Sequence, residues 1–231
     1  MDEAGAQLPA PVRDLAIRLG ANPRLRRDAV RLSQSGRMRP GAGAGWSDFT
    51  ADETISTTGC AFDWRARTGV MGAIRIRDSL SLGEARLEAR VFGFLPAARL
   101  GVSAAVTRGE LIRYLAELAW APDAILHNPA LRWRALEGKR GFELGAGEGD
   151  AAASVEVSLD ADGRIGAVFA ADRPRATAAG ETPTPWRGRF SNYRLSHGLW
   201  TPLDGASAWE IGGEDVTCWE AHVTAWTIWP D

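Results

Sequence analysis

The chain has 231 residues, a formal net charge of −2, 45% hydrophobic residues and 24% charged residues. A chain of this length can bury roughly 70–75% of its unfolded surface, and its composition is that of an ordinary globular protein. The near-neutral charge excludes a general attraction to nucleic acid or to anionic membranes. No stretch reaches the roughly 18 apolar residues of a membrane span, and the acidic first residues lack the apolar core of a signal peptide. We therefore expect one cytoplasmic domain, residues 1–231, without a membrane span.

The chain is predicted to begin with a short helix and to continue with strands. Pro11 suits the first turn of a helix, and Gly20 suits the position just after the last turn. Residues 1–28 are therefore expected to form a helical arm. Over residues 30–100, hydrophobic and polar residues alternate repeatedly. This period of two predicts a first set of half-buried antiparallel strands with one solvated face.

Residues 107–128 are predicted to form a central amphipathic helix followed by a short turn. Thr107 and Glu110 have the spacing of a capping box, and Pro122 ends the run. The apolar residues cover an arc of about 200° on a helical wheel, whereas a helix on a flat sheet needs only about 100°. We therefore expect the sheet to curve around the helix. The residues expected to be buried include Leu111, Leu115 and Leu118. The polar side carries Glu110, Arg113 and Glu117. Of these, Arg113 and Glu117 are expected to be exposed, and replacing Arg113 by Ala is expected to cost little.

Alternation resumes over residues 131–229, which are predicted to form a second strand set. Asp160 and Gly163 occupy favoured positions of a hairpin turn. The segment 172–185 is rich in Pro, Gly and Thr, which predicts a mobile loop. The whole pattern predicts an α+β fold that is mainly antiparallel β, with a highly curved, half-barrel-like sheet around one helix.

Several short stretches together resemble a known family. They are Leu8–Val12, Gly36–Arg39, Arg108–Pro122, Leu131–Trp133, Asp160–Ile165, Phe190–Pro202 and Ser207–Glu210. Over nearly its whole length the chain resembles an uncharacterised bacterial family of domains of unknown function. Its strand–helix–strand order is also similar to the lipoprotein-carrier half-barrel, which implies a strongly curved antiparallel sheet cupping a helix over an apolar cavity. No catalytic residue is carried over, because none is assigned in the family and a fold does not fix a function.

Two groups of residues are candidates for chemistry. Cys218, Glu220 and His222 alternate along one predicted strand and so share a face, and all three are metal-ligand types. The set lacks a complete tetrahedral shell, so we predict a solvated face and no metal or cofactor. Catalysis by His197 would need a nearby nucleophile and an orienting acid. No Gly-x-Ser-x-Gly elbow is present, so no catalytic residue is predicted. Cys60 and Cys218 are expected to be free thiols, with an inter-strand disulfide left open.

Arginine pairs such as Arg65/Arg67 and Arg187/Arg189 recur on the predicted strands. A basic sheet interleaved with tryptophan can bind single-stranded nucleic acid by stacking. Acidic residues interrupt these pairs, however, and the net charge is near zero. The pattern therefore favours a solvated outer face, and no nucleic-acid partner is predicted.

Ten tryptophans are more than a core of this size needs. Trp120 points away from the apolar arc of the helix and is expected at the rim where helix and sheet part. Indole suits a rim because its ring contacts apolar ligands while its N–H finds a polar partner. We predict an apolar pocket bordered by Trp120 and by Trp186 or Trp200, although side chains could instead fill the space.

The function predicted from these observations is non-enzymatic binding of an apolar or amphipathic, lipid-like small molecule. Two alternatives stay open at this point. One is an enzyme, such as a hydrolase or isomerase that uses His197 or Glu220. The other is a structural domain that binds a protein partner.

Overall fold

The computed structural model describes residues 8–41, 43–91, 95–100, 103–138, 140–177 and 180–229. Thirteen strands in these residues form one sheet, and every neighbouring pair is antiparallel. The first six strands are β1 (Ala29–Met38), β2 (Ser47–Ser56), β3 (Phe62–Thr68), β4 (Ile74–Ser81), β5 (Glu84–Val91) and β6 (Leu95–Leu100). The remaining strands are β7 (Arg132–Ala135), β8 (Gly141–Ala146), β9 (Ala153–Leu159), β10 (Ile165–Thr177), β11 (Gly180–Ser196), β12 (Leu199–Ile211) and β13 (Glu214–Trp229). The α-helices are α1 (Ala10–Arg18), α2 (Ala104–Glu117) and α3 (Ala124–His127), and two short 3₁₀ turns are η1 (Val70–Gly72) and η2 (Gly149–Ala151).

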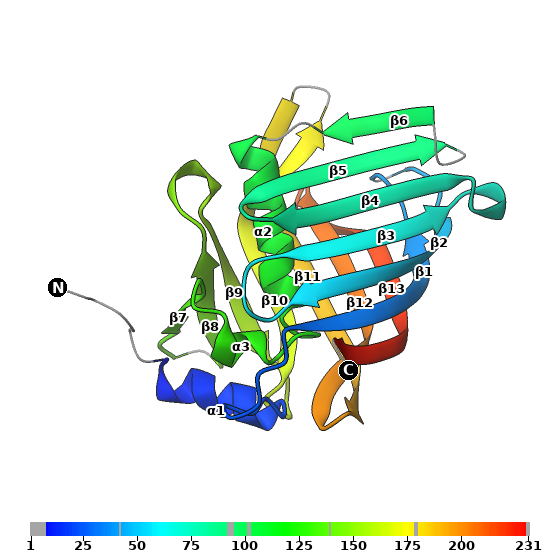
Figure 1. Ribbon diagram of the computed structural model, residues 1–231. Helices are drawn as coiled ribbons and strands as arrows, with labels where there is room; N and C mark the ends of the chain where they lie inside the picture. Colours follow the sequence, from blue (N-terminus) through cyan, green and yellow to red (C-terminus); the bar gives the residue numbers. More distant parts are fainter. Residues whose placement is uncertain are drawn as a thin grey trace.

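The order of the strands shows how the two halves of the chain meet. Across the sheet the order is β6-β5-β4-β3-β2-β1-β13-β12-β11-β10-β9-β8-β7. The chain therefore runs from the middle of the sheet to one edge and crosses through α2 and α3 to the other edge (Figure 1). It then returns strand by strand to the middle, where β13 pairs with β1. Gly36 allows this central pairing, since a Cβ there would lie 2.1 Å from the carbonyl oxygen of Glu220.

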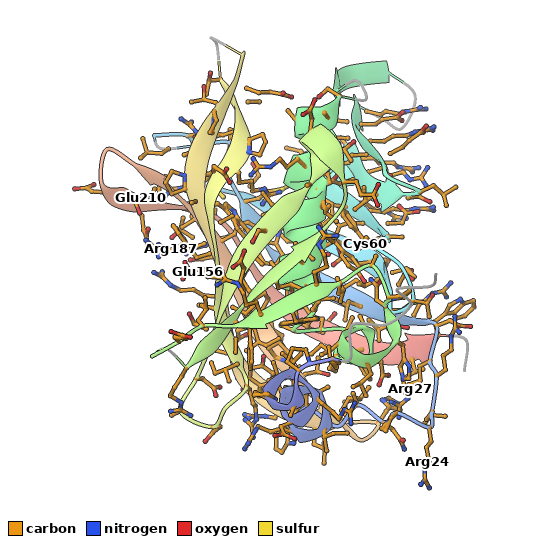
Figure 2. The ribbon with its side chains drawn as sticks, turned by 90° about the vertical axis from the view of Figure 1, so that its left-hand side faces the viewer. Arg24, Arg27, Cys60, Glu156, Arg187 and Glu210 are labelled. Carbon is orange, nitrogen blue, oxygen red and sulfur yellow. The ribbon has the colours of Figure 1, made fainter. Side chains whose placement is uncertain are left out.

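The sheet is strongly curved. Helix α2 contacts β4 and β5 from one half and β8, β9 and β10 from the other. Because these strands are far apart in the sheet order, both halves can reach one helix only if the sheet bends toward it, as Figure 2 shows. Register shifts at Ser33/Gln34 and Ser207/Ala208 mark bulges, which increase the local twist of a strand. The predicted curved, mainly antiparallel sheet is therefore confirmed.

Helix α2 begins earlier than predicted. Its N-cap is Ser103, whose Oγ accepts a hydrogen bond from the Val106 N–H at 3.1 Å. The predicted cap, Thr107, is instead a buried residue inside the helix. A serine in the same favoured class of cap residues lies four positions earlier, and its side chain satisfies the free N–H.

The amphipathic character predicted for α2 is not confirmed. Leu111, Leu115 and Leu118 are buried as expected. Arg113 and Glu117, expected to be exposed, are buried as well, with side chains only 17% and 7% exposed. The cause is the curvature of the sheet, because strands cover the polar side of the helix as well as the apolar side.

The segment 172–185, predicted to be a mobile loop, is mostly β-structure. It extends β10 and β11 into a long hairpin, apart from two residues that lie outside the described chain. Pro174 lies opposite Pro183. The two missing N–H donors therefore fall at the same position of the ladder, which limits the cost of two prolines in adjacent strands.

The N-terminal helix α1 is docked on the body of the protein. Val12, Leu15 and Ala16 are buried, and the helix contacts α3 and β7. The backbone N–H of Trp200 donates to the Leu19 carbonyl at 2.8 Å. These contacts fasten the arm to the lower end of the sheet in Figure 1.

The burial of Leu115 makes a first prediction. Leu115 is 1% exposed, so Leu115→Ala should lower the free energy of unfolding by about 2–5 kcal/mol. Chemical denaturation measures this change. The control is Leu195→Ala on β11, where the leucine is 61% exposed and little change is expected. Equal stability of the two variants would contradict the enclosed position of α2.

Candidate functional site

A cavity of about 170 Å³ lies between α2 and the inner face of the curved sheet. Its lining comes from α2, from the segment just after α2, and from strands β3, β4, β10, β11, β12 and β13. The aromatic lining residues are Trp64, Trp120, Trp186, Phe190 and Trp219. The charged lining residues are Asp78, Arg113, Glu117 and Arg173. The cavity therefore combines aromatic walls with a group of charged side chains.

Trp120 forms part of the wall and is only 3% exposed. Its indole N–H donates to the Pro202 carbonyl at 2.8 Å, and its ring meets Phe190 edge-on at 5.1 Å. Gly205 makes room for the ring, since a Cβ there would lie 2.9 Å from an indole carbon. The Trp120 ring is thus held in place by its indole hydrogen bond, by edge-on contacts with Phe190 and Trp219, and by the absence of a side chain at Gly205 on β12.

The structure separates the other two tryptophans predicted for the pocket. Trp186 on β11 lines the cavity and is 5% exposed. Trp200 on β12 is absent from the lining, and the Arg164 guanidinium lies 3.8 Å from the centre of its ring. The cavity therefore brings together Trp120 and Trp186 but not Trp200.

Sequence reasoning missed three aromatic residues of the cavity wall. Trp64 and Trp219 lie on strand faces that the alternation pattern marks as inward, and Phe190 belongs to β11. An inward position predicts burial, but it does not distinguish a packed core from a cavity wall. The Trp64 indole N–H donates to Gln34 at 3.1 Å, so this wall also has a fixed orientation.

A buried charge cluster adjoins the cavity and is centred on Arg113. Its guanidinium donates to Glu117 at 2.5 Å, to Asp78 at 2.6 Å and to Glu53 at 2.8 Å. Glu53, on β2, is 2% exposed and also accepts a hydrogen bond from Gln34. The cluster therefore joins α2 to β2 and β4 through one arginine.

The cluster contains more carboxyls than guanidiniums. Glu110 on α2 lies near Arg173, which brings the total to four carboxyls and two guanidiniums. Within the described residues, Asp78 Oδ1 and Glu110 Oε2 are buried and have no hydrogen-bond partner. Buried charges are costly unless they are paired. Because carboxyls outnumber guanidiniums, the cluster favours the protonated, neutral form of some of its carboxyls.

Burial raises the pKa of three carboxyls of the cluster, Glu53, Glu110 and Glu117. Burial, followed by repulsion from Asp78, raises the pKa of Glu110 to about 8. Burial and repulsion from Glu117 raise the pKa of Glu53 well above its usual range. Burial also raises the pKa of Glu117, although Arg113 opposes that rise. At neutral pH the Glu110 carboxyl is therefore mostly protonated.

The raised pKa of Glu110 makes the stability of the protein depend on pH. Between about pH 4.5 and 8 the unfolded chain releases this proton while the folded protein retains it. The free energy of unfolding should therefore fall as pH rises, by on the order of 1 kcal/mol per pH unit, and level off above pH 8. Glu110→Gln should remove this contribution, whereas Glu84→Gln on the exposed end of β5 should not. Denaturation curves at four pH values between 5 and 8 compare the slopes, and equal slopes in all three proteins would contradict the assignment.

The position of Arg113 makes a further prediction and corrects the expectation that its loss costs little. Arg113→Ala leaves three buried carboxyls without their shared cation. We expect a loss of about 3–5 kcal/mol in the free energy of unfolding, as for other broken buried pairs. Arg65→Ala is the control, since Arg65 is 66% exposed and pairs with Asp63 at the surface. It should cost at most about 1 kcal/mol. Urea denaturation separates the two outcomes.

Cys218, Glu220 and His222 have separate partners. Glu220 pairs with Arg37 at 2.7 Å, and His222 Nδ1 lies 2.6 Å from Asp204. The Cys218 thiol lies 3.5 Å from the Ser207 carbonyl oxygen. Within the described ranges, no three His, Cys, Asp or Glu residues are grouped so that they could hold a metal. Cys60 and Cys218 are both free thiols.

His197 lies in the tight turn between β11 and β12, with a φ of 50°. Its Nδ1 is 2.9 Å from the Ser196 hydroxyl, and its ring is 5.8 Å from that of Trp226. It takes no part in the cavity lining. The turn geometry thus accounts for the Ser196–His197 contact.

Several of the paired arginines on the strands form salt bridges with acidic neighbours. Arg187 lies 3.0 Å from Glu210, and both extend from the same side of the sheet in Figure 2. Arg65 and Arg77 share Asp63. These contacts match the expected solvated outer face, where acidic residues interrupt the basic ones.

Solved structures with the same kind of fold define its class. A domain from Vibrio parahaemolyticus named for outer membrane lipoprotein sorting has a TM-score of 0.53 at 9% identity, over 95% of this chain and 91% of that one. A DUF1329 family protein from Desulfovibrio piger has a TM-score of 0.50 at 9% identity, over 96% of this chain and 95% of that one. A LolA superfamily protein from Nitrosomonas europaea has a TM-score of 0.48 at 9% identity, over 94% and 92%. The first two likenesses show that the chain shares the fold of the Vibrio parahaemolyticus domain and of the Desulfovibrio piger protein.

The family of this chain follows from its amino-acid sequence. Residues 1–221 match the family of unknown function DUF6544, and the chain belongs to that family. The predicted resemblance to a family of unknown function with a half-barrel architecture is thus confirmed. No curated protein matches the sequence. In the described part of the chain, no helix has the length and apolar character needed to cross a membrane.

Proposed function

We propose that this protein binds an apolar or amphipathic small molecule, without altering it, in the cavity between α2 and the curved sheet. The observation that carries the proposal is the set of five aromatic side chains in the cavity lining. Ligand sites are typically concave and apolar, with a few polar groups that fix orientation. The charged side chains of the same lining supply such groups.

The walls are ordered before a ligand arrives. Trp120 and Trp64 each donate an indole hydrogen bond, and Trp120 packs edge-on against Phe190 and Trp219. Side chains that are fixed in advance reduce the entropy lost on binding. The aromatic wall is therefore suited to recognition.

The size of the cavity restricts the ligand. An apolar cavity of about 150 Å³ in another protein accommodates benzene, and the cavity here is about 170 Å³. We infer that it takes a single ring or a short alkyl chain, or the corresponding part of a larger amphiphile. The half-barrel fold is consistent with this proposal but does not identify the ligand.

The charged lining supports a second candidate function. Asp78 and Glu117 lie in the cavity wall beside Arg113, and burial raises the pKa of Glu117. A buried carboxyl with a raised pKa is typical of general acids and bases. An enzyme acting on a small amphiphile would therefore use these residues rather than His197 or Glu220. Recovery of a bound ligand in chemically altered form would favour this candidate. The cytoplasmic location and the single-domain organisation stay predictions from the sequence.

Titration with a neutral probe tests the proposal. Octan-1-ol should change the tryptophan fluorescence saturably, because tryptophans form most of the aromatic wall. Ala116→Leu adds bulk to a lining residue of α2 and should weaken binding at least tenfold, provided that the variant stays folded in thermal denaturation. Ala130→Leu changes an exposed alanine and should bind as the natural sequence does. Absence of saturable binding, confirmed by native mass spectrometry, would remove the proposed function.

A further inference from the structure

Arg173 on β10 is a cation of the cavity wall without a close anionic partner. Its nearest carboxylate oxygen belongs to Glu110 and lies 4.0 Å away, although the Arg173 side chain is only 13% exposed. Its guanidinium lies 4.6 Å from the ring centre of Trp186 and 5.5 Å from that of Trp209. Within the described residues it makes no hydrogen bond.

The contrast with Arg113 shows how unusual this is. Arg113 has three carboxylate partners within 2.8 Å. A guanidinium carries five N–H donors, and buried donors normally have acceptors. Arg173 therefore presents unused donors beside an aromatic wall, in a place where a ligand can supply the acceptor.

We propose that Arg173 binds the carboxylate head group of an amphiphile whose apolar part lies against Trp120 and Trp186. This inference rests on the proposed function and specifies its ligand class. Arginine recognises carboxylates with two parallel hydrogen bonds, which adds geometric selectivity to charge attraction. The Trp186 and Trp209 rings next to Arg173 stabilise its charge by cation–π contacts and use none of its N–H donors.

The charge balance of the surrounding cluster explains why the head group of the proposed ligand is negatively charged. The groups facing Glu110 are Asp78 from β4, Arg173 from β10 and Arg113 from its own helix, with Glu53 and Glu117 beyond. When Glu110 is protonated, Arg173 has no anionic partner of its own. A ligand carboxylate then replaces Glu110 as the counter-ion of Arg173, and the ligand brings a single negative charge to that position.

Three probes with one alkyl chain and different head groups test this assignment. At pH 7 octanoate should bind at least tenfold more tightly than octan-1-ol, and octylammonium should bind most weakly. Equal affinity for all three would overturn the head-group assignment and leave the proposed function standing. Binding of none would overturn both. Tightest binding of octylammonium would identify the carboxyl cluster, instead of Arg173, as the head-group site.

Variants of two arginines on β10 separate the head group from the cavity. Arg173→Met should reduce octanoate affinity to that of octan-1-ol while octan-1-ol still binds, which also shows that the variant is folded. Arg173→Lys retains the charge without the paired donors and should give an intermediate octanoate affinity. Arg175→Met is the matched control, because Arg175 lies on the same strand but outside the cavity lining. Unchanged octanoate affinity in Arg173→Met would overturn the inference.

The pH dependence of octanoate binding gives a readout specific to Glu110. Burial and Asp78 raise the pKa of Glu110 to about 8. Above that pH Glu110 ionises and competes with octanoate for Arg173, so affinity should fall, by up to tenfold per pH unit. In Glu110→Gln the fall should be absent, because glutamine carries no charge at any pH. An identical fall in Glu110→Gln would overturn the competition between ligand and Glu110.

Discussion

The single crossing from β6 to β7 is the constraint on which the rest of this structure depends. Every other connection joins neighbouring strands, so α2 and α3 alone carry the chain from one edge of the sheet to the other. A helix that begins beside one edge and ends toward the opposite edge has sheet on both sides. Its polar residues then have no solvated face to occupy. Arg113 and Glu117 are buried for this reason, and carboxyls from β2 and β4 meet them there.

The burial of these charges accounts for the mixed character of the cavity. A half-barrel closed by purely apolar packing would leave a hydrophobic space or none. Here the inner surface carries both an aromatic wall and ionisable groups. The protonation of these groups depends on how close their charged neighbours lie. Binding and protonation are consequently linked, since any ligand that changes the charge near Arg173 also changes the energy of the proton on Glu110.

The local patterns of the sequence predict much of the fold. Alternation of polar and apolar residues locates the strands, and the wide apolar arc of the helix predicts that the sheet curves toward it. Three features escape this reasoning because they depend on contacts between distant segments. The helical wheel cannot show that Glu53 and Asp78 lie opposite Arg113. Proline-rich composition suggests a loop at 172–185, although pairing of Pro174 with Pro183 permits a hairpin. The alternation pattern also shows which strand positions face inward, but not how much space their side chains leave. A cavity wall and a packed core therefore have the same pattern.

The candidate site, like the fold, could be predicted only in part from the sequence. Trp120 and Trp186 were predicted for the pocket, and both line the cavity, whereas Trp200 contacts Arg164 elsewhere. The rim position expected for Trp120 differs from its buried place in the wall, where Gly205 gives it room. Arg173 gave no signal in the sequence because it lies in the segment expected to be a loop. Its importance follows only from the strand pairing that brings it beside Trp186.

The pairing of β1 with β13 has a consequence for how the protein is made. The strands in the middle of the sheet come from opposite ends of the chain, with Ala29 beside Trp229 and Met38 beside Trp219. During synthesis β1 leaves the ribosome before β13 does, so the central seam cannot form until all the strands between them have been made. Until then β1 has an unpaired inner edge, and such edges are prone to pair with other chains. Contacts between distant residues also form slowly. The fold therefore places its latest and slowest step at its centre, where the two halves of the sheet join.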